Sequence, residues 1–107
     1  MTAGLQSFRF CAASELPEGS MRSALVGGRA VAVARQGGRL FALGALCPHQ
    51  QADLSLGILE PGSITCADHL WRFELASGRC ASVPGAVVPV YAVREEDGQV
   101  LVDLVPR

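Results

Sequence analysis

Two short stretches, Cys47-Pro48-His49 and Cys66-Ala67-Asp68-His69, decide how this sequence is interpreted. Each begins with a cysteine and ends with a histidine, and the chain contains no other histidine. Thiolates and imidazoles are the ligands of zinc sites and of some iron–sulfur centres. The two stretches therefore predict a metal site formed by Cys47, His49, Cys66 and His69.

The spacing of these residues bears on which metal they hold. In a C2H2 zinc finger the two cysteines share one short unit and the two histidines share another, on a helix. Here each unit is mixed, and sixteen residues separate His49 from Cys66. A mixed pair on each of two loops suits a [2Fe–2S] centre in which histidines replace the cysteines on one iron. A structural zinc module is the alternative from a different functional class.

The rest of the chain has the pattern of an all-β protein. Alternating or β-branched runs are separated by glycine-containing turns such as Gly27-Gly28, Gly37-Gly38, Pro61-Gly62 and Asp97-Gly98, and no segment sustains helical periodicity. The predicted strands are Gln6–Cys11, Ser20–Val26, Arg29–Arg35, Arg39–Leu43, Ser63–Cys66, Trp71–Leu75, Val87–Val93 and Gln99–Val105. We expect one domain over residues 1–107, with a scaffold formed by residues 1–44 and 86–107 and a cluster-binding subdomain at residues 45–85.

Composition and charge exclude several classes of function. The 107 residues carry a formal net charge of −1 without a basic stripe, which argues against nucleic-acid binding. No apolar stretch approaches the roughly 20 residues needed to cross a bilayer, so we expect no membrane association. Residues 1–10 lack the apolar core of a secretory signal, which predicts a cytoplasmic protein. Because disulfides are rare in that compartment, metal binding is the better interpretation of the cysteines.

The stretch from Ile64 to Phe73, together with Cys47-Pro48-His49-Gln50, resembles the cluster-binding region of Rieske ferredoxins. Its CPHQ and TC-x₂-HLW-x-F segments are most similar to the ferredoxin components of toluene-type di-iron monooxygenases. This resemblance implies the Rieske fold, an antiparallel β-sandwich scaffold with an inserted two-loop cluster-binding subdomain. It also implies one Rieske-type [2Fe–2S] cluster per chain.

Carried over to this chain, the resemblance implies that Cys47 and Cys66 bind the inner iron. His49 and His69 would bind the outer iron through Nδ1. Respiratory Rieske proteins have a further cysteine in each ligand loop, and these two cysteines form a disulfide. This sequence has Ala52 and Asp68 near those places, which argues against a respiratory subunit.

The function that the resemblance implies is electron transfer without catalysis. The protein would carry one electron from a flavin-dependent NAD(P)H reductase to a terminal oxygenase, with the monooxygenase type favoured, in the oxidation of aromatic compounds or other hydrocarbons. Both partners would dock near His49 and His69, with Trp71 as a further candidate contact. We expect a monomer. The alternatives are the ferredoxin of a ring-hydroxylating dioxygenase and the small Rieske-type subunit of nitrite reductase.

Other residues have a structural interpretation. Cys11 and Cys80 are expected in the core, because unpaired cysteine is among the most buried residue types. Trp71 is either an exposed docking residue or a core aromatic on the same face as Phe73. Pro84-Gly85 resembles the proline loop that covers the cluster in Rieske proteins. The acidic run at residues 95–97 is expected at a solvated hairpin tip.

Overall fold

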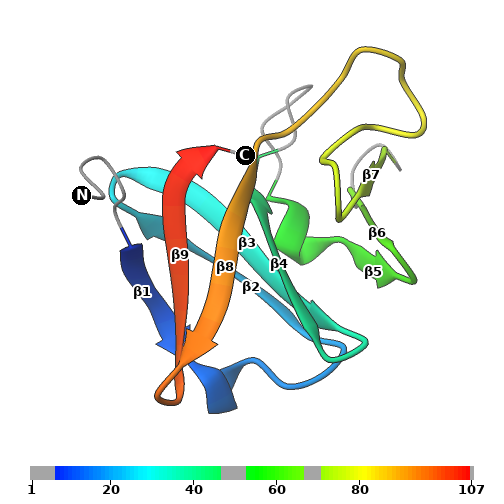
Figure 1. Cartoon of the computed structure of the whole chain (residues 1–107). Helices are drawn as coiled ribbons and strands as arrows, with labels where there is room; N and C mark the ends of the chain where they lie inside the picture. The colour runs from blue at the N-terminus through cyan, green and yellow to red at the C-terminus, as the bar shows by residue number, and fades with distance from the viewer. Residues whose placement is uncertain (1–6, 47–52, 67–70, 107) are drawn as a thin grey trace.

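The computed structural model of the chain describes residues 7–46, 53–66 and 71–106. These residues form antiparallel sheets and two single-turn 3₁₀ helices (Figure 1). In chain order the elements are β1 (Ser7–Ala12), η1 (Ala13–Glu15), β2 (Met21–Val26), β3 (Arg29–Gln36), β4 (Arg39–Gly44), η2 (Leu54–Leu56), β5 (Ile58–Glu60), β6 (Ser63–Thr65), β7 (Arg72–Glu74), β8 (Val90–Glu96) and β9 (Gln99–Pro106). The predicted all-β fold is confirmed.

The larger sheet has six strands in the order β1-β9-β8-β4-β3-β2. Two-residue turns close three of its hairpins at residues 27–28, 37–38 and 97–98, and both residues of each turn have positive φ. Positive φ at both positions defines the type I′ turn, whose twist matches that of the flanking strands. These turns are the glycine-containing pairs that the sequence predicted, and the acidic run at residues 95–97 lies at an exposed hairpin tip as expected.

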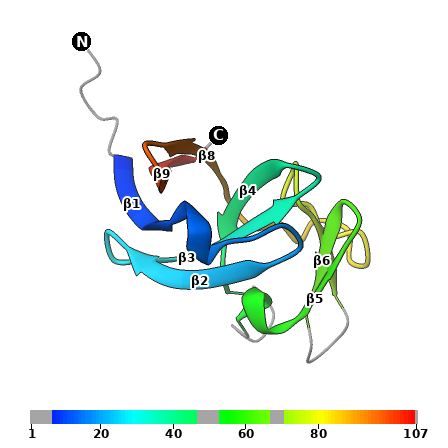
Figure 2. The same cartoon turned by 90° about the horizontal axis from the view of Figure 1, so that it is seen from below.

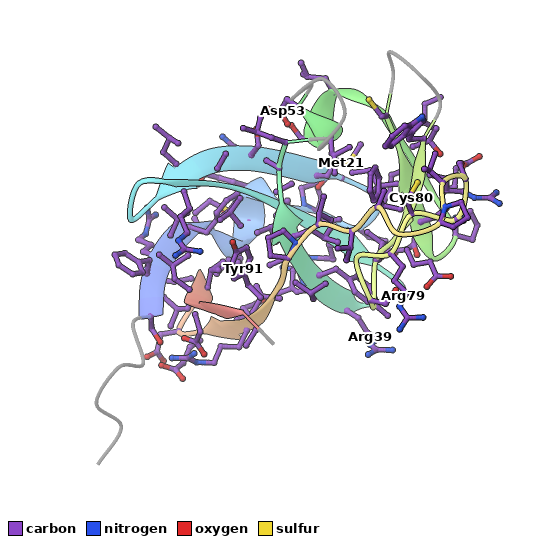
Figure 3. The ribbon with its side chains drawn as sticks, turned by 90° about the horizontal axis from the view of Figure 1, so that it is seen from above. Met21, Arg39, Asp53, Arg79, Cys80 and Tyr91 are labelled. Carbon is purple, nitrogen blue, oxygen red and sulfur yellow. The ribbon has the colours of Figure 1, made fainter. Side chains whose placement is uncertain are left out.

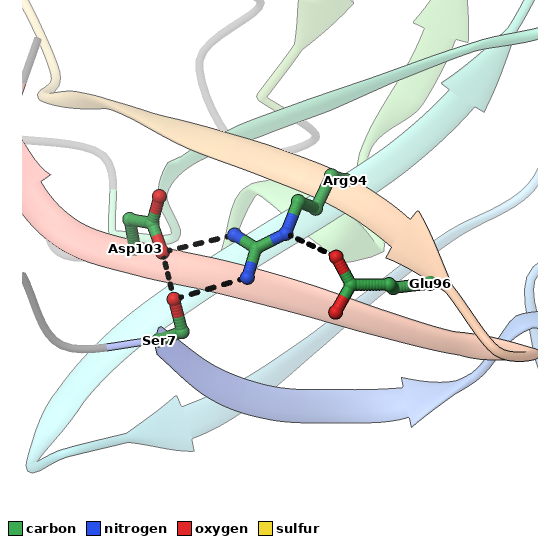
Figure 4. Close-up of polar contacts among 4 residues, drawn as sticks. All are labelled: Ser7, Arg94, Glu96 and Asp103. Atoms are coloured by element: carbon green, nitrogen blue, oxygen red, sulfur yellow. Dashed lines mark hydrogen bonds and ion pairs between the residues drawn. The ribbon is translucent and has the colours of Figure 1, made fainter.

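Polar contacts tie three strands of this sheet together on its outer side. Arg94 of β8 forms ion pairs with Glu96 on the same strand and with Asp103 on β9, each at 3.3 Å. Ser7 of β1 donates a hydrogen bond to Asp103 and accepts one from Arg94 (Figure 4). Exposed pairs of this kind typically contribute less than about 1 kcal/mol to stability, so they are a minor part of what stabilises the sheet.

The smaller sheet has the strand order β5-β6-β7 and lies to one side of the larger one (Figure 2). Strands β3 and β4 are packed on both faces. Val31 and Val33 belong to the core inside the six-stranded sheet, whereas Ala34 and Leu43 belong to a second core that includes Phe73 of the smaller sheet. Strands β3 and β4 therefore lie between the two cores and contribute side chains to both.

A long segment returns from β7 to β8 and crosses the second core. Val88 is buried there, and its N–H donates a 2.9 Å hydrogen bond to the carbonyl of Gly78. A Cβ atom at Gly78 would lie 2.2 Å from the Val88 carbonyl oxygen, and the residue has a φ of +75°. Only glycine allows this approach, which fixes the returning segment against the smaller sheet.

The predicted and observed strands differ in a few places. Strand β5 and both 3₁₀ helices were not predicted, because each has only three residues and, unlike β6 and β7, none lies within a longer run with a strand pattern. Strand β8 begins at Val90 instead of Val87, since Val87 forms an isolated bridge with Arg79. Among the described residues, no helix is long and apolar enough to span a membrane.

Candidate metal centre

Of the four predicted ligands, the structure describes Cys66. Its side chain is 0% exposed, it directly follows β6, and it belongs to the second core. Cys47, His49 and His69 lie outside the described residues, as do Pro48, Gln50, Ala52 and Asp68. Within residues 7–46, 53–66 and 71–106 no three His, Cys, Asp or Glu side chains are grouped as a metal site would require. The predicted ligand set therefore stays a prediction.

The segment that contains His69 is closed at its base by the smaller sheet. The Cys66 N–H donates a 2.8 Å hydrogen bond to the Trp71 carbonyl, and the next pair outward is Thr65 with Arg72. Trp71 is half-buried and packs against the second core, whereas Phe73 is fully buried. The interpretation of Trp71 as a core aromatic is thus met in part, because the side chain packs against the core and is still partly exposed, and its docking role stays a prediction.

The segment that contains Cys47 and His49 is closed at its base by a different set of contacts. Leu46 and Asp53 form an antiparallel bridge, and the Leu54 N–H donates a 2.7 Å hydrogen bond to the Ala45 carbonyl. Leu54 is fully buried in the same core as Cys66. The residues Leu54, Cys66 and Trp71, which flank or belong to the two predicted ligand segments, therefore lie in or pack against one shared hydrophobic core. Sixteen residues of sequence separate His49 from Cys66.

Asp53 lies at the start of η2 (Figure 3) and takes part in several hydrogen bonds. Its carboxylate accepts hydrogen bonds from the Ser23 hydroxyl at 2.6 Å, the Ser55 N–H at 2.9 Å and the Ser55 hydroxyl at 2.8 Å. Burial alone would raise the pKa of this carboxyl, but the hydrogen bonds from Ser23 and Ser55 outweigh it and hold the pKa below its usual value. We did not predict these residues, although Asp at the N-cap two positions before Ser is a recognisable signal.

The residues present fit a Rieske-type centre. Two thiolates and two neutral imidazoles form the donor set of such a cluster. The complete burial of Cys66 suits a thiolate ligand of the iron further from solvent. The shared core beneath both segments provides a rigid base for donors that must be held in fixed geometry.

Cys11 and Cys80 are both buried, as predicted, and both are free thiols. Burial raises the pKa of the Cys11 thiol. Cys80 borders a cavity of about 470 Å³ that is also lined by Pro84 and Val87. Pro84 and Gly85 occupy the corners of a turn in which the Ala86 N–H donates to the Val83 carbonyl at 3.2 Å. Gly85 has a φ of +89°, as the second corner of a type II turn requires.

Comparison with known proteins places this arrangement in a family. The model of the Rieske [2Fe–2S] domain matches residues 6–100. The chain is 34% identical over 91 residues to the ferredoxin component of the naphthalene 1,2-dioxygenase system of Pseudomonas aeruginosa, covering 84% of this chain and 88% of that protein.

Solved structures share the whole fold. The complex of reduced oxygenase and oxidised ferredoxin in carbazole 1,9a-dioxygenase contains a chain that superposes with a TM-score of 0.84 at 33% identity, covering 94% of this chain and 95% of that chain. A Mycobacterium tuberculosis chain assigned as an NADH-dependent nitrite reductase small subunit gives a TM-score of 0.85 at 28% identity, covering 94% and 96%. The chain belongs to the Rieske [2Fe–2S] domain family, and it is similar over most of its length to electron-transferring ferredoxin components of oxygenase systems.

Proposed function

We propose that this chain carries single electrons to the terminal oxygenase of an aromatic ring-hydroxylating dioxygenase system. The observation that carries the proposal is the pair of complete motifs at residues 47–49 and 66–69, in a chain whose similarity to a naphthalene dioxygenase ferredoxin extends over 84% of its length. The HLW-x-F segment favoured a monooxygenase. Similarity over most of the chain weighs more than similarity in one short segment, so the dioxygenase alternative is the better supported of the two.

The proposed ligands divide into two chemical pairs. Cys47 and Cys66 would hold the inner iron as thiolates, and His49 and His69 would hold the outer iron as neutral imidazoles. When bound, the cluster would accept and release one electron at a potential of about −150 to +300 mV, compared with about −400 mV for plant-type ferredoxins. The difference follows from the charge of the centre. Two ferric ions, two sulfides and two thiolates have no net charge, and neutral imidazoles add none, whereas a centre with four thiolates carries a charge of −2 and accepts an electron less readily. One cluster per chain follows from one ligand set.

Residues 45–85 would act as the cluster-binding subdomain and residues 1–44 and 86–107 as its scaffold. Three exposed apolar side chains lie on the elements that flank the first ligand segment: Leu46 before it is 42% exposed, and after it Leu56 of η2 is 77% and Ile58 of β5 54% exposed. We propose that these side chains, with Trp71, contact the terminal oxygenase. Transient redox complexes typically bury less than about 1,200 Å², which a patch of this kind can provide.

The electron donor would be a flavin-dependent NAD(P)H reductase that uses the same face in turn. Sharing one face means that the protein binds reductase and oxygenase alternately, as a monomeric shuttle. This arrangement suits a chain with a small net charge of −1, because neither partner is then held by strong electrostatic attraction. A cytoplasmic location would place the carrier beside a nicotinamide-dependent reductase.

The cofactor is tested by purifying the protein anaerobically and measuring iron, acid-labile sulfide and the EPR spectrum after reduction. Two irons, two sulfides and a Rieske-type spectrum are expected. A colourless protein with one zinc would overturn the proposal, because zinc is redox-inactive.

The choice between a dioxygenase and a monooxygenase as electron acceptor is tested by mixing the reduced protein with a naphthalene-type dioxygenase and, separately, with a di-iron monooxygenase hydroxylase. Faster oxidation by the dioxygenase is expected. Transfer to the di-iron hydroxylase alone would favour the monooxygenase.

The small subunit of a nitrite reductase is the second candidate, because the Mycobacterium tuberculosis chain shares the fold with a TM-score of 0.85. The complete ligand set counts against this role, since members of that group often lack ligands. Adding the chain to a nitrite reductase large subunit would separate the candidates. Restored NADH-dependent nitrite reduction, without transfer to any oxygenase, would support the second.

A further inference from the structure

Asp53 connects two parts of the molecule that are distant in sequence. It caps η2, the 3₁₀ turn that follows the first predicted ligand segment. Its Oδ2 accepts a 2.6 Å hydrogen bond from Ser23, which lies thirty residues earlier on β2 of the six-stranded sheet. A hydrogen bond to an ionised carboxylate is among the strongest that proteins form. One contact therefore attaches the end of this segment to the scaffold.

The surrounding bonds make this attachment rigid. Oδ1 of Asp53 accepts from both the N–H and the hydroxyl of Ser55, and the Ser23 and Ser55 hydroxyls lie 3.0 Å apart within hydrogen-bond distance. Both carboxylate oxygens are thus occupied, and the side chain has little freedom to rotate. Because Asp53 also forms a backbone bridge with Leu46, the contact holds both ends of the segment that contains Cys47 and His49.

The second ligand segment is attached through the backbone of the smaller sheet. It begins at Cys66 and ends at Trp71, and the hydrogen bond between these two residues continues the ladder of the smaller sheet. One segment is thus held by a side-chain network to the larger sheet, and the other by backbone pairing within the smaller sheet. A cluster bound by both would depend on how precisely the two attachments are placed relative to each other.

We propose that Asp53 is a positioning residue, which together with Ser23 and Ser55 fixes the first ligand segment in the geometry that the cluster requires. The inference rests on the proposed function, because it assigns Cys47 and His49 as ligands. Asp53 would act through the backbone of this segment and would not bind iron itself. Outer contacts that orient metal ligands commonly change metal affinity by about 10- to 100-fold.

The test compares two serines on the purified, cluster-loaded protein. Ser23→Ala removes the hydroxyl that reaches Asp53. Ser20→Ala removes a hydroxyl that donates an equally short 2.6 Å hydrogen bond, to the Pro17 carbonyl, just before the same strand. The rate at which a chelator bleaches the visible absorbance is measured well below the unfolding temperature, and the EPR spectrum of the reduced protein is recorded. Ser23→Thr serves as the rescue variant, because it retains the hydroxyl.

We expect Ser23→Ala to release the cluster about tenfold faster and to shift the EPR g values. Ser20→Ala and Ser23→Thr should match the wild type in both measurements, whatever their melting temperatures. The inference is overturned if Ser23→Ala releases its cluster at the wild-type rate with an unchanged spectrum, or if Ser20→Ala accelerates release equally. A wild-type protein that contains no iron would overturn the proposed function, and this inference with it.

Discussion

The two sheets of this protein are stabilised in different ways. The six-stranded sheet is built from strands of six to eight residues with three tight hairpins, and the side chains of its own strands, together with Leu16, form the buried core that it encloses. The smaller sheet has strands of three residues, and it completes its core with Ala34, Leu43 and Val88 from outside that sheet. Three-residue strands are not stable on their own in water. The part of the molecule that carries the candidate metal centre is therefore the part that depends on its neighbours.

Removing the metal should affect the two sheets unequally, and this is the largest effect we expect. Without the cluster, amide exchange in β5, β6 and β7 should accelerate at least about tenfold, because metal binding and local folding are coupled. Exchange in β3, β8 and β9 should change little, since these strands pair over most of their length. Hydrogen exchange of the holo- and chelator-treated proteins measures both regions at once.

The Cys66→Ser variant, purified without metal, is the control for damage caused by the chelator. It should reproduce the exchange pattern of the stripped protein. Equal acceleration in both sheets would contradict the comparison, because it would mean that the scaffold also depends on the metal.

The sequence predicted the larger sheet well for a local reason. Type I′ turns need two residues with positive φ, and pairs such as Gly37-Gly38 and Asp97-Gly98 are typical of such turns, so a short stretch of sequence is enough to predict them. Strand β5 was missed because its pairing with β6 leaves no comparable pattern in three residues. The two-faced burial of β3 was also missed, since alternating valine and alanine does not show that a second sheet covers the alanine face.

The site was predictable in its chemistry more than in its support. The Cys-x-His and Cys-x₂-His spacings predict a metal centre directly, and burial of Cys66 agrees with that role. The contact between Ser23 and Asp53 joins residues on separate elements, so no local pattern shows that they meet. The type of oxygenase was predicted from one short segment next to the ligands. A ferredoxin binds its partner through a surface, and the ligand motif does not specify that surface.

Adding a methyl group at Gly78 should weaken the attachment of the smaller sheet. Gly78→Ala combines a φ of +75° with a Cβ placed 2.2 Å from the Val88 carbonyl oxygen, so we expect a loss of about 2–4 kcal/mol in the free energy of unfolding. The control is Gly85→Ala in the same segment, where φ is +89° but no heavy atom of the described residues, apart from the two chain neighbours, lies within 4 Å of the added Cβ. Its cost should be only about 1 kcal/mol. Equal losses in denaturant unfolding would show that the close approach does not matter.

Placing a charge at one of the exposed apolar side chains proposed to contact the oxygenase should affect partner binding without affecting the fold. Leu56→Glu should slow electron transfer to the oxygenase about tenfold or more, since an unpaired charge would be buried in the complex. The control is Ser14→Glu, which adds the same charge to η1 beside the distant β8–β9 hairpin. Stopped-flow oxidation and the reduction potential are measured together. A potential that shifts in Leu56→Glu would contradict a pure docking role.

The smallest expected effect concerns a turn of the larger sheet. Hydrogen bonds from the N–H groups of Gly38 and Gly37 to the Glu18 carboxylate lower the pKa of that carboxyl. Because the folded pKa is depressed, the contribution to stability is present above the unfolded pKa of about 4.3 and is lost as pH falls through the folded value. Glu18→Gln should therefore lower the melting temperature slightly at pH 6 and leave it unchanged at the acid end of the titration.

Asp97→Asn is the matched control for this titration, since it removes one carboxylate from another hairpin turn and asparagine tolerates the φ of 53° at that position. Thermal unfolding is followed for all three proteins from pH 6 to about pH 3. If Glu18→Gln and Asp97→Asn flatten the acid limb equally, the effect is one of net charge and the hydrogen bonds to Gly37 and Gly38 contribute nothing specific. If only Glu18→Gln makes the melting temperature less dependent on pH, a single side chain stabilises a hairpin of the larger sheet. This result would agree with a larger sheet that is stabilised by its own residues and does not depend on the metal.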